Sequence, residues 1–164
     1  MICARDIVAA DFPRLLTLNE SCVPHVNSIG MTEMAAFQRE ATVMRLWEEA
    51  GELAGFVIAL TAGAAYKSLN YQWFSEHMDS FLYIDRIMVH ENFRRRGVAT
   101  LIYTELAQMA RQQGLTCLTC EVNLQPPNPD SMALHTGLGF RETATQKTEG
   151  GTKEVSLLVK MLGA

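Results

Sequence analysis

The sequence of 164 residues lacks any apolar run that approaches the roughly 18 residues of a membrane-spanning helix. Its N-terminal segment meets an acidic side chain, Asp6, too early for a secretory signal peptide. It has no internal repeat, no low-complexity tract and no linker rich in serine and glycine. These absences predict a single domain over residues 1–164 that is cytoplasmic and has no membrane contact.

Cysteine is also scarce, with only four in the chain: Cys3, Cys22, Cys117 and Cys120. A cytosolic domain of this length does not need disulfides, so we expect four free thiols. Cys117 and Cys120 have the spacing of a C-x-x-C motif, but they lie in a strand-like run where positions three apart face opposite sides. His25, His77 and His90 are scattered and show no ligand spacing, so no metal site is predicted.

Basic residues are fewer than acidic ones, with 14 Lys and Arg against 18 Asp and Glu and a net charge of −4. A long polyanion gains no general attraction to such a chain, which argues against a nucleic-acid partner. The run Arg94-Arg95-Arg96 is then a local feature. Hydrophobic residues make up 48% and charged residues 20%, as in an ordered globular protein.

Hydrophobic periodicity predicts strands and helices in mixed order, which indicates an α/β domain. Gly51 suits a tight hairpin turn, Thr32 suits a helix N-cap and Gly114 suits a helix end. Residues 62–80 break the pattern, and we predict a long loop there. The expected strands are 2–9, 43–48, 53–61, 81–89, 115–122, 140–146 and 154–159, and the expected helices are 11–22, 32–41, 98–113 and 131–136.

The turn Arg94-Arg95-Arg96-Gly97-Val98-Ala99 joins the strand of residues 81–89 to the helix that follows. The start of a helix leaves backbone N–H groups without intrahelical partners and carries the positive end of the helix dipole. Gly97 lets the backbone approach an anion closely, and arginine matches phosphate oxygens with a planar fork. This turn therefore predicts a pyrophosphate site.

Three later segments accompany this turn: Cys120-Glu121-Val122-Asn123, Asn128-Pro129-Asp130-Ser131 and Ala133-Leu134-His135-Thr136-Gly137-Leu138-Gly139-Phe140. Together they resemble the GNAT superfamily of acetyl-CoA-dependent N-acetyltransferases. That family has (Gln/Arg)-x-x-Gly-x-(Gly/Ala) between a strand and a helix, then an Asn and an aromatic-x-x-x-Gly-Phe ending. The resemblance, close over residues 80–145, implies the GNAT fold, with a mixed, mostly antiparallel sheet of about six or seven strands flanked by about four helices.

The resemblance implies that acetyl-CoA lies between the strands that end at Val89 and Val122. Backbone groups of Ile87, Met88 and Val89 would meet the pantetheine arm and the thioester, and the Val89 N–H would stabilise the oxyanion. Asn128 would bind the pantetheine arm, with Asn123 as the alternative because Gln125-Pro126-Pro127 is inserted here. The pyrophosphate would be held by Arg94, Arg95, Arg96, Gly97, Val98, Ala99 and Thr100.

An alkylamine has a pKa near 10.4 and must lose a proton before it attacks a thioester, so a base is required. Glu121 is the first candidate, because some relatives use a Glu in the matching Glu-Val pair; the alternative is a solvated carboxylate at a strand end. Asp85 is the second, because it interrupts an apolar strand; the alternative is an ion pair with an arginine. Alternation places Arg86 on the opposite face from Asp85 and Tyr83.

His135 stands where the family commonly has a tyrosine that protonates the departing CoA thiolate. An imidazolium donates a proton and a neutral imidazole accepts one, so His135 is a candidate acid. A thiol similar to cysteine has a pKa near 8.5, which makes the thiolate a tolerable leaving group and the help of an acid modest. A histidine that only packs or contacts the cofactor is the alternative.

The resemblance places the amine acceptor beside residues 23–31 and 66–78. Tyr71, Trp73 and Phe74, with Tyr83, are substrate-binding candidates, and the alternative is that they cover the core. A small free amine or an amino-acid-like molecule is favoured over a protein N-terminus, because an aromatic loop resembles a lid. A non-catalytic acyl-CoA-binding module on the same fold is the alternative function, and a homodimer is the favoured assembly.

Overall fold

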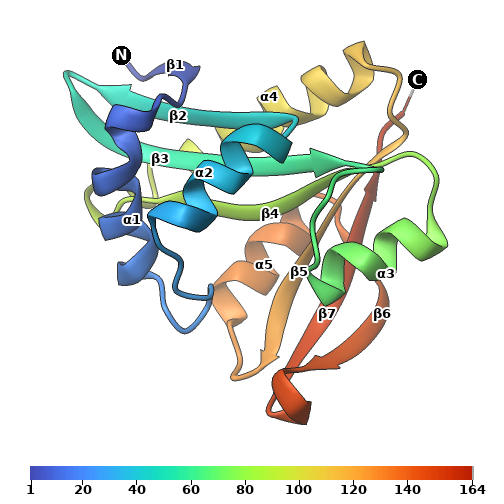
Figure 1. Ribbon diagram of the computed structural model, residues 1–164. Coiled ribbons are helices and arrows are strands. Elements are labelled where there is room, and N and C mark those ends of the chain that lie inside the picture. The colour runs from blue at the N-terminus through green and yellow to red at the C-terminus, as the bar shows by residue number, and fades with distance from the viewer. Residues whose placement is uncertain (164) are drawn as a thin grey trace. The chain divides into compact units, whose positions relative to one another are not determined.

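The structure, a computed structural model, describes residues 1–163, which form a seven-stranded sheet and five α-helices (Figure 1). The strand order is β1-β2-β3-β4-β5-β7-β6. The strands are β1 (Cys3–Asp6), β2 (Val43–Glu49), β3 (Glu52–Thr61), β4 (Leu82–Val89), β5 (Cys117–Gln125), β6 (Arg141–Thr148) and β7 (Lys153–Met161). The helices are α1 (Phe12–Ser21), α2 (Met31–Glu40), α3 (Leu69–His77), α4 (Val98–Gln112) and α5 (Pro129–Gly137).

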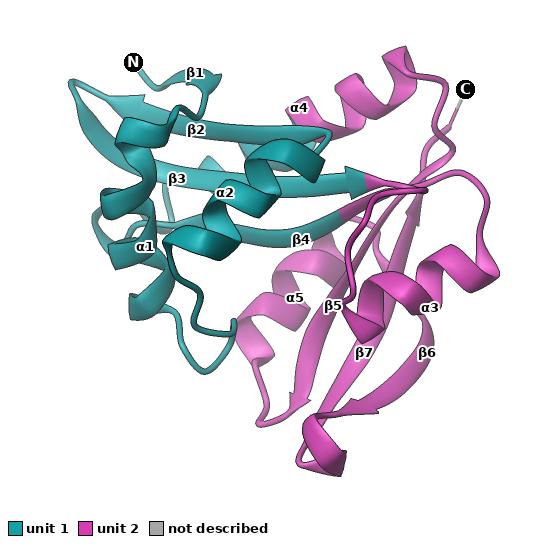
Figure 2. Ribbon diagram, viewed as in Figure 1, with its two compact units in different colours: residues 1–60, 84–104 teal, residues 61–83, 105–164 magenta. Residues whose placement is uncertain are grey.

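The chain divides into two compact units, coloured separately in Figure 2. Unit 1 comprises residues 1–60 and 84–104, and unit 2 comprises residues 61–83 and 105–164. The predicted mixed and mostly antiparallel sheet is confirmed, because β4 and β5 pair in parallel whereas β1–β2, β2–β3, β5–β7 and β6–β7 pair antiparallel. The prediction of a single domain stays a prediction.

In unit 1, β1, β2 and β3 form an antiparallel sheet, in which Val43 of β2 lies opposite Ala59 of β3. The β2–β3 hairpin turns at Ala50 and Gly51, with φ angles of 52° and 82°. Two residues with positive φ make the kind of turn that matches the twist of paired strands, and glycine adopts it without strain. The predicted tight turn at Gly51 is confirmed.

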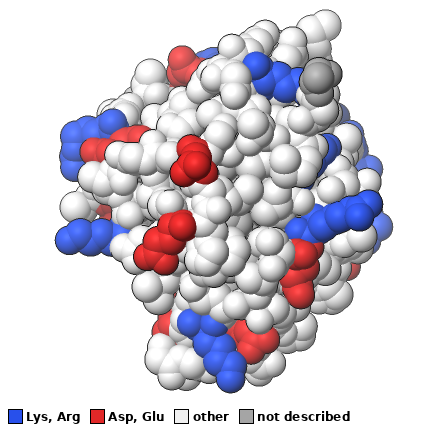
Figure 3. All heavy atoms as spheres, turned by 90° about the vertical axis from the view of Figure 1, so that its right-hand side faces the viewer, with Lys and Arg blue, Asp and Glu red and all other residues white. Residues whose placement is uncertain are grey.

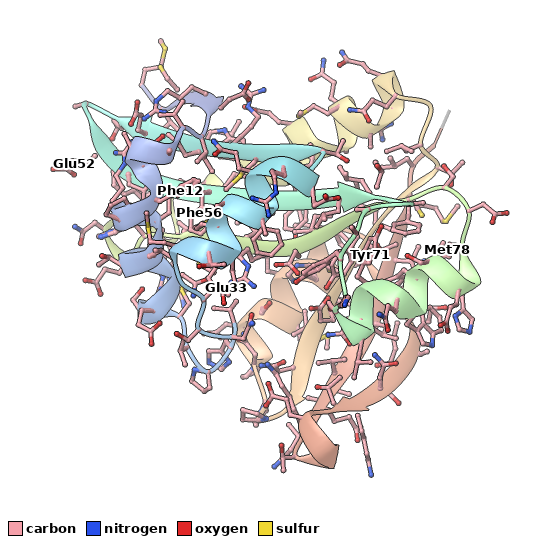
Figure 4. All side chains as sticks on the ribbon, viewed as in Figure 1. Phe12, Glu33, Glu52, Phe56, Tyr71 and Met78 are labelled. Atoms are coloured by element: carbon pink, nitrogen blue, oxygen red, sulfur yellow. The ribbon has the colours of Figure 1, made fainter. Side chains whose placement is uncertain are left out.

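The core of unit 1 forms where α1 and α2 cover the strands. Figure 4 shows Phe12 on α1 and Phe56 on β3, which are 3% and 0% exposed. Burying an aromatic or branched side chain of this size contributes about 1.5 to 3 kcal/mol. Helix α2 begins one residue before the predicted cap at Thr32: Gly30 is its N-cap, and the Gly30 N–H donates to the Glu33 carboxylate at 2.9 Å.

A cluster of four charged side chains joins β1, β2 and the start of α1 in unit 1. The guanidinium of Arg5 donates to both oxygens of Asp11, each at 2.8 Å. Arg14 donates to Asp11 at 2.8 Å and to Glu48 at 3.0 Å. The hydrogen bonding from Arg5 is the largest cause that lowers the pKa of Asp11. A separate hydrogen bond, from Arg5 Nε to Glu48 at 3.0 Å, is the largest cause that lowers the pKa of Glu48.

This cluster predicts an acid-sensitive contribution to stability. A carboxyl whose pKa is lower in the folded chain stabilises the fold above its unfolded pKa of about 3.9 and loses that effect as the pH falls further. We therefore expect Asp11→Asn to lower the free energy of unfolding by about 1 to 3 kcal/mol at pH 7. Urea unfolding of parent and variant should show this difference shrinking below about pH 4. A difference independent of pH would contradict the assignment.

Unit 2 contains the paired strands β5, β7 and β6. At the start of β4, Leu82 and Tyr83 pair in parallel with Leu118 and Thr119 of β5. Strand β5 continues to Gln125, because its pairing with β7 extends past the predicted end at Val122. Glu121 therefore lies within β5, and the expected end of this strand at residue 122 was wrong.

Helix α3 was not predicted, and the expectation of a loop over 62–80 was wrong for residues Leu69–His77. Ser68 is its N-cap, with the hydroxyl oxygen accepting the Tyr71 N–H at 3.4 Å. Tyr71 and Phe74 lie on its buried side at 2% and 0% exposure. The helix is short and is stabilised by aromatic packing, whereas its residues have only average helix propensity.

Charges on the molecular face drawn in Figure 3 are scattered, and basic and acidic groups are interspersed without a broad basic patch. As expected from the sequence, none of the four cysteines, all of which lie in the described part of the chain, forms a disulfide. Cys117 and Cys120 are buried, and burial raises the pKa of the Cys117 thiol. Neither cysteine has the setting of a reactive thiolate.

Candidate active site

The loop that was predicted to hold a pyrophosphate joins β4 to α4 in unit 1. A short 3-10 helix, Glu91–Phe93, precedes it, and helix α4 begins at Val98. Arg95 and Gly97 have φ angles of 59° and 79°, in the left-handed region. When left-handed residues such as these alternate with right-handed or extended ones, successive backbone N–H groups turn toward one side. They then form a concave surface that binds anions. The predicted strand, turn and helix are confirmed.

The start of α4 supplies N–H donors to this loop. Its first helical hydrogen bond runs from the Leu101 N–H to the Gly97 carbonyl at 2.9 Å. The N–H groups of Val98, Ala99 and Thr100 precede that bond and have no acceptor within the helix. A Cβ built on Gly97 would meet no atom within 4 Å, so space is open beside the loop backbone. These features fit a diphosphate group.

The three arginines of this loop differ in their contacts. Arg94 donates from Nε to the Val89 carbonyl at 3.3 Å. Arg96 donates to Glu49 at 2.9 Å and lies over the Phe93 ring at 4.8 Å from its centroid. The side chain of Arg95 is exposed and has no partner among residues 1–163. Arg95 is therefore the cation of the three that an incoming anion meets without displacing another contact.

The end of β4 approaches β3 unusually closely at Gly55. A Cβ on Gly55 would collide with the Met88 carbonyl oxygen, and the His90 N–H donates to the Ala54 carbonyl at 2.8 Å. Only glycine allows this approach, which fixes the backbone of Met88 and Val89 against β3. Gly55 was not among the predicted site residues, although an isolated glycine within an apolar strand signals a close backbone approach.

Asp85 lies in unit 1 and is paired with its sequence neighbour. Arg86 Nε donates to Asp85 Oδ2 at 2.7 Å, and the two side chains are 2% and 4% exposed. This is the ion pair that the sequence left open as the alternative role of Asp85. The expectation that Arg86 faces away from Asp85 was wrong, because the long arginine side chain turns its Nε toward the carboxylate.

Glu121 and Tyr83 meet in unit 2, where β5 and the start of β4 are paired. The Tyr83 hydroxyl lies 2.9 Å and 2.8 Å from the two carboxylate oxygens of Glu121 and donates to them. Tyr83 is fully buried and packs against Tyr71 and Phe74 of α3, with ring centroids 5.5 Å and 5.8 Å apart. Glu121 is thus held in a fixed position beside an aromatic cluster, rather than solvated at a strand end.

The aromatic candidates on α3 have different surroundings. The hydroxyl of Tyr71 donates to the Thr61 carbonyl at 2.6 Å and accepts the Ala64 N–H at 3.0 Å, and Figure 4 labels this side chain. Phe74 packs on Phe81. Trp73 is half-buried and stacks on His77 with centroids 3.9 Å apart. Tyr71 and Phe74 thus cover the core of unit 2, whereas Trp73 reaches the surface.

His135 is buried in α5, with 4% of its surface exposed, and packs edge-on against Phe140. Its Nδ1 lies 2.6 Å from the Ser131 carbonyl oxygen. A carbonyl only accepts, so Nδ1 carries a proton and Nε2 is the acceptor when the ring is neutral. Burial lowers the pKa of His135 below its usual value of 6.5, and the Ser131 hydrogen bond opposes that shift.

Asn128, the predicted partner of the pantetheine arm, is the N-cap of α5. Its side-chain oxygen accepts the Ser131 N–H at 3.3 Å, which leaves its amide N–H groups as the donors for a ligand. Asn123 is 6% exposed, and its carbonyl accepts the Asn128 N–H at 3.2 Å. The assignment of the arm to Asn128 stays a prediction.

No group of three or more His, Cys, Asp and Glu side chains among residues 1–163 is placed to hold a metal ion. No helix in the described part of the chain has the length and apolar character needed to cross a bilayer.

The sequence model of the acetyltransferase (GNAT) family matches residues 12–140. The chain belongs to the GNAT family. It is accordingly an N-acetyltransferase, and acetyl-CoA is the co-substrate of this GNAT enzyme. The predicted family, fold and acetyl donor are confirmed. No curated protein matches the chain at a significant level.

Solved GNAT structures share the fold across nearly their whole length. The ribosomal-protein-S18-alanine N-acetyltransferase from Escherichia coli is 17% identical, with a TM-score of 0.75 and coverage of 100% of this chain and 96% of the other. Ard1 from Thermoplasma volcanium is 16% identical, with a TM-score of 0.79 and 99% coverage of both. A putative acetyltransferase from Salmonella typhimurium, solved with acetyl-CoA, is 17% identical with a TM-score of 0.72, covering 100% and 95%.

Proposed function

We propose that this enzyme transfers the acetyl group of acetyl-CoA to the primary amine of a small molecule or an amino-acid-like acceptor, by direct attack in a ternary complex. The contact between Tyr83 and Glu121 carries the proposal. An ionised carboxylate only accepts hydrogen bonds, and a phenol that donates to it holds it in place. Glu121 then takes a proton from the ammonium group, directly or through a water molecule, and releases the nucleophilic amine.

The remaining steps use backbone and side-chain groups that the resemblance to the family assigns. As the amine nitrogen bonds to the thioester carbon, the Val89 N–H donates to the oxygen that becomes negative. The carbon–sulfur bond then breaks, the nitrogen gives its remaining extra proton to water to leave a neutral amide, and the thiolate of CoA takes up a proton. His135 is proposed to supply that proton or to hydrogen-bond the sulfur, and Asp85 serves its ion pair with Arg86 rather than the reaction. Arg95 and the N–H groups of residues 95–100 hold the diphosphate.

The lowered pKa of His135 determines how this acid should behave. Only the imidazolium donates from Nε2, and its population falls as the pH rises above that lowered pKa. We expect His135→Phe to reduce kcat by about tenfold at pH 6 and by less at pH 8. Thiol release at saturating acetyl-CoA measures this difference. A variant with the parent's kcat and pH profile would remove His135 from the reaction.

The acceptor class and the assembly belong to the same proposal. A small free amine is the favoured acceptor. Peptide N-termini are tested as well, because the Escherichia coli neighbour is named for an alanine of a ribosomal protein. A homodimer and a cytoplasmic location are also proposed. Light scattering of the purified protein tests the dimer.

The proposal is tested with a panel of amines and acetyl-CoA, monitored by thiol release. The panel contains ethanolamine, spermidine, phenethylamine, alaninamide and a tetrapeptide with an N-terminal alanine. Calorimetry with CoA runs in parallel. Turnover of at least one amine supports the proposal, whereas saturable CoA binding without turnover of any amine favours a non-catalytic acyl-CoA-binding module.

A further inference from the structure

Arg86 is a buried cation in β4 that the proposed chemistry does not use. The residue is 4% exposed, and its surroundings are α1, α2 and the segment that joins them in unit 1. Moving an arginine from water into a protein interior costs several kcal/mol unless its charge and its N–H groups are paired. The partners of Arg86 therefore show which parts of the chain it holds.

The guanidinium contacts at least four residues. Arg86 donates from Nε to Asp85 at 2.7 Å, from Nη1 to the side-chain oxygen of Asn19 at 2.7 Å, and from Nη2 to that of Asn27 at 2.8 Å. Its Cζ lies over the Phe37 ring, 5.3 Å from the centroid. We call Arg86 and these four residues the Arg86 clamp.

Asn27 is the member of the clamp that belongs to no helix or strand. It lies in the connection between α1 and α2, residues 22–30, and is largely exposed. Its side-chain oxygen accepts from Arg86, and its carbonyl accepts from Asn19 Nδ2 at 3.1 Å. Another hydrogen bond, from Ser28 Oγ to Glu20 at 2.7 Å, lies at the surface. An exposed connection of this kind opens readily, and the clamp anchors it to a buried cation of β4.

The chemistry of the clamp suits the positioning of a loop better than the filling of a core. An ion pair in a protein interior is often replaceable by apolar side chains without loss of stability. An apolar side chain offers no bond to Asn27, whereas the planar fork of arginine fixes both the distance and the direction of its acceptors. Arg86 thus holds the exposed segment of residues 22–30 against strand β4.

We propose that Arg86 is a positioning residue that fixes residues 22–30 as one wall of the amine-acceptor site. The inference rests on the proposed function, since the family resemblance places residues 23–31 beside the acceptor. A displacement of about 1 Å in a substrate-positioning segment is enough to cost a large factor in catalytic efficiency. Loss of the clamp raises the KM of the amine. It leaves CoA affinity unchanged, because the loop proposed to hold the diphosphate, residues 94–100, is a separate segment.

The experiment compares Asn27→Ala and Asn27→Asp in the full chain, with Gln38→Ala as a control at an exposed position on α2. The acceptor is whichever panel amine the parent acetylates with the lowest KM. We expect Asn27→Ala to raise that KM about tenfold, with kcat and the Kd of CoA within about twofold. Asn27→Asp keeps an oxygen that accepts from Arg86 and should retain the parent KM. Hydrogen exchange over residues 22–30 should accelerate in Asn27→Ala alone.

Arg86→Met is a second variant, expected to raise the same KM at least as far, with circular dichroism to check its fold. If it does not fold, Asn27→Ala still decides the question, because that side chain is exposed. If the parent turns over normally and Asn27→Ala changes neither the KM of the amine nor hydrogen exchange over residues 22–30, the positioning role is overturned. A loss of CoA affinity as large as the rise in the KM of the amine would overturn it as well. If the parent acetylates none of the panel amines, the proposed function is contradicted. The proposed role of residues 22–30 in the acceptor site is then contradicted as well.

Discussion

Replacing Glu121 with glutamine is expected to lower kcat by about 10² to 10⁴-fold at neutral pH, because an amide cannot accept the amine proton. The substitution keeps the size of the side chain and one oxygen that accepts from the Tyr83 hydroxyl. The fold and CoA binding should therefore survive. The measurement is thiol release at saturating acetyl-CoA between pH 6 and pH 10. Activity of the variant should recover toward high pH, where the amine is already deprotonated.

Tyr83→Phe is the matched control for this experiment. It removes the hydroxyl that donates to Glu121 but keeps the carboxylate and the ring that packs against Tyr71 and Phe74. A carboxylate that loses a donor is easier to protonate, so the acidic limb of the rate profile should move to higher pH. If Glu121→Gln keeps the parent kcat and pH profile, the base is Asp85 or a water molecule.

The parts of the fold that local rules determine were predictable from the sequence. Gly51 and Gly97 have positive φ angles, and Gly114, with φ of 74°, closes α4 as expected. Each of these positions depends on a few neighbouring residues and on the freedom of glycine from side-chain clashes. The anion-binding turn could be predicted for the same reason, because the strand, the glycine and the helix start are contiguous.

The arrangement of the candidate site depended on contacts between distant segments. Tyr83 and Glu121 are 38 positions apart and meet only because β4 and β5 pair in a particular register. A shift of one residue would turn one of them to the other face of the sheet. The contacts of the Arg86 clamp could not be predicted from the sequence either, because no sequence pattern links Asn19 and Asn27 to β4. Helix α3 was missed because burial, rather than propensity, stabilises it.

Replacing Gly97 with glutamate is expected to weaken acetyl-CoA binding by at least about 100-fold. Two effects add. A side chain at φ of 79° costs about 1 to 2 kcal/mol of backbone strain. A carboxylate then repels the diphosphate that the N–H groups of the loop would bind, and this repulsion is the larger effect because the site loses its preference for anions. Calorimetric titration with CoA measures the change.

Two control variants separate these effects. Gly97→Ala introduces the strain without the charge, and its Cβ would meet no protein atom within 4 Å, so it should lose only about tenfold in affinity. Gly114→Glu places the same charge at a glycine with φ of 74° and open surroundings, at the opposite end of α4. That variant should bind CoA as the parent does. If Gly97→Glu also binds CoA with the parent's affinity, the turn at residues 94–100 does not hold the diphosphate, and the cofactor must be gripped elsewhere in the chain.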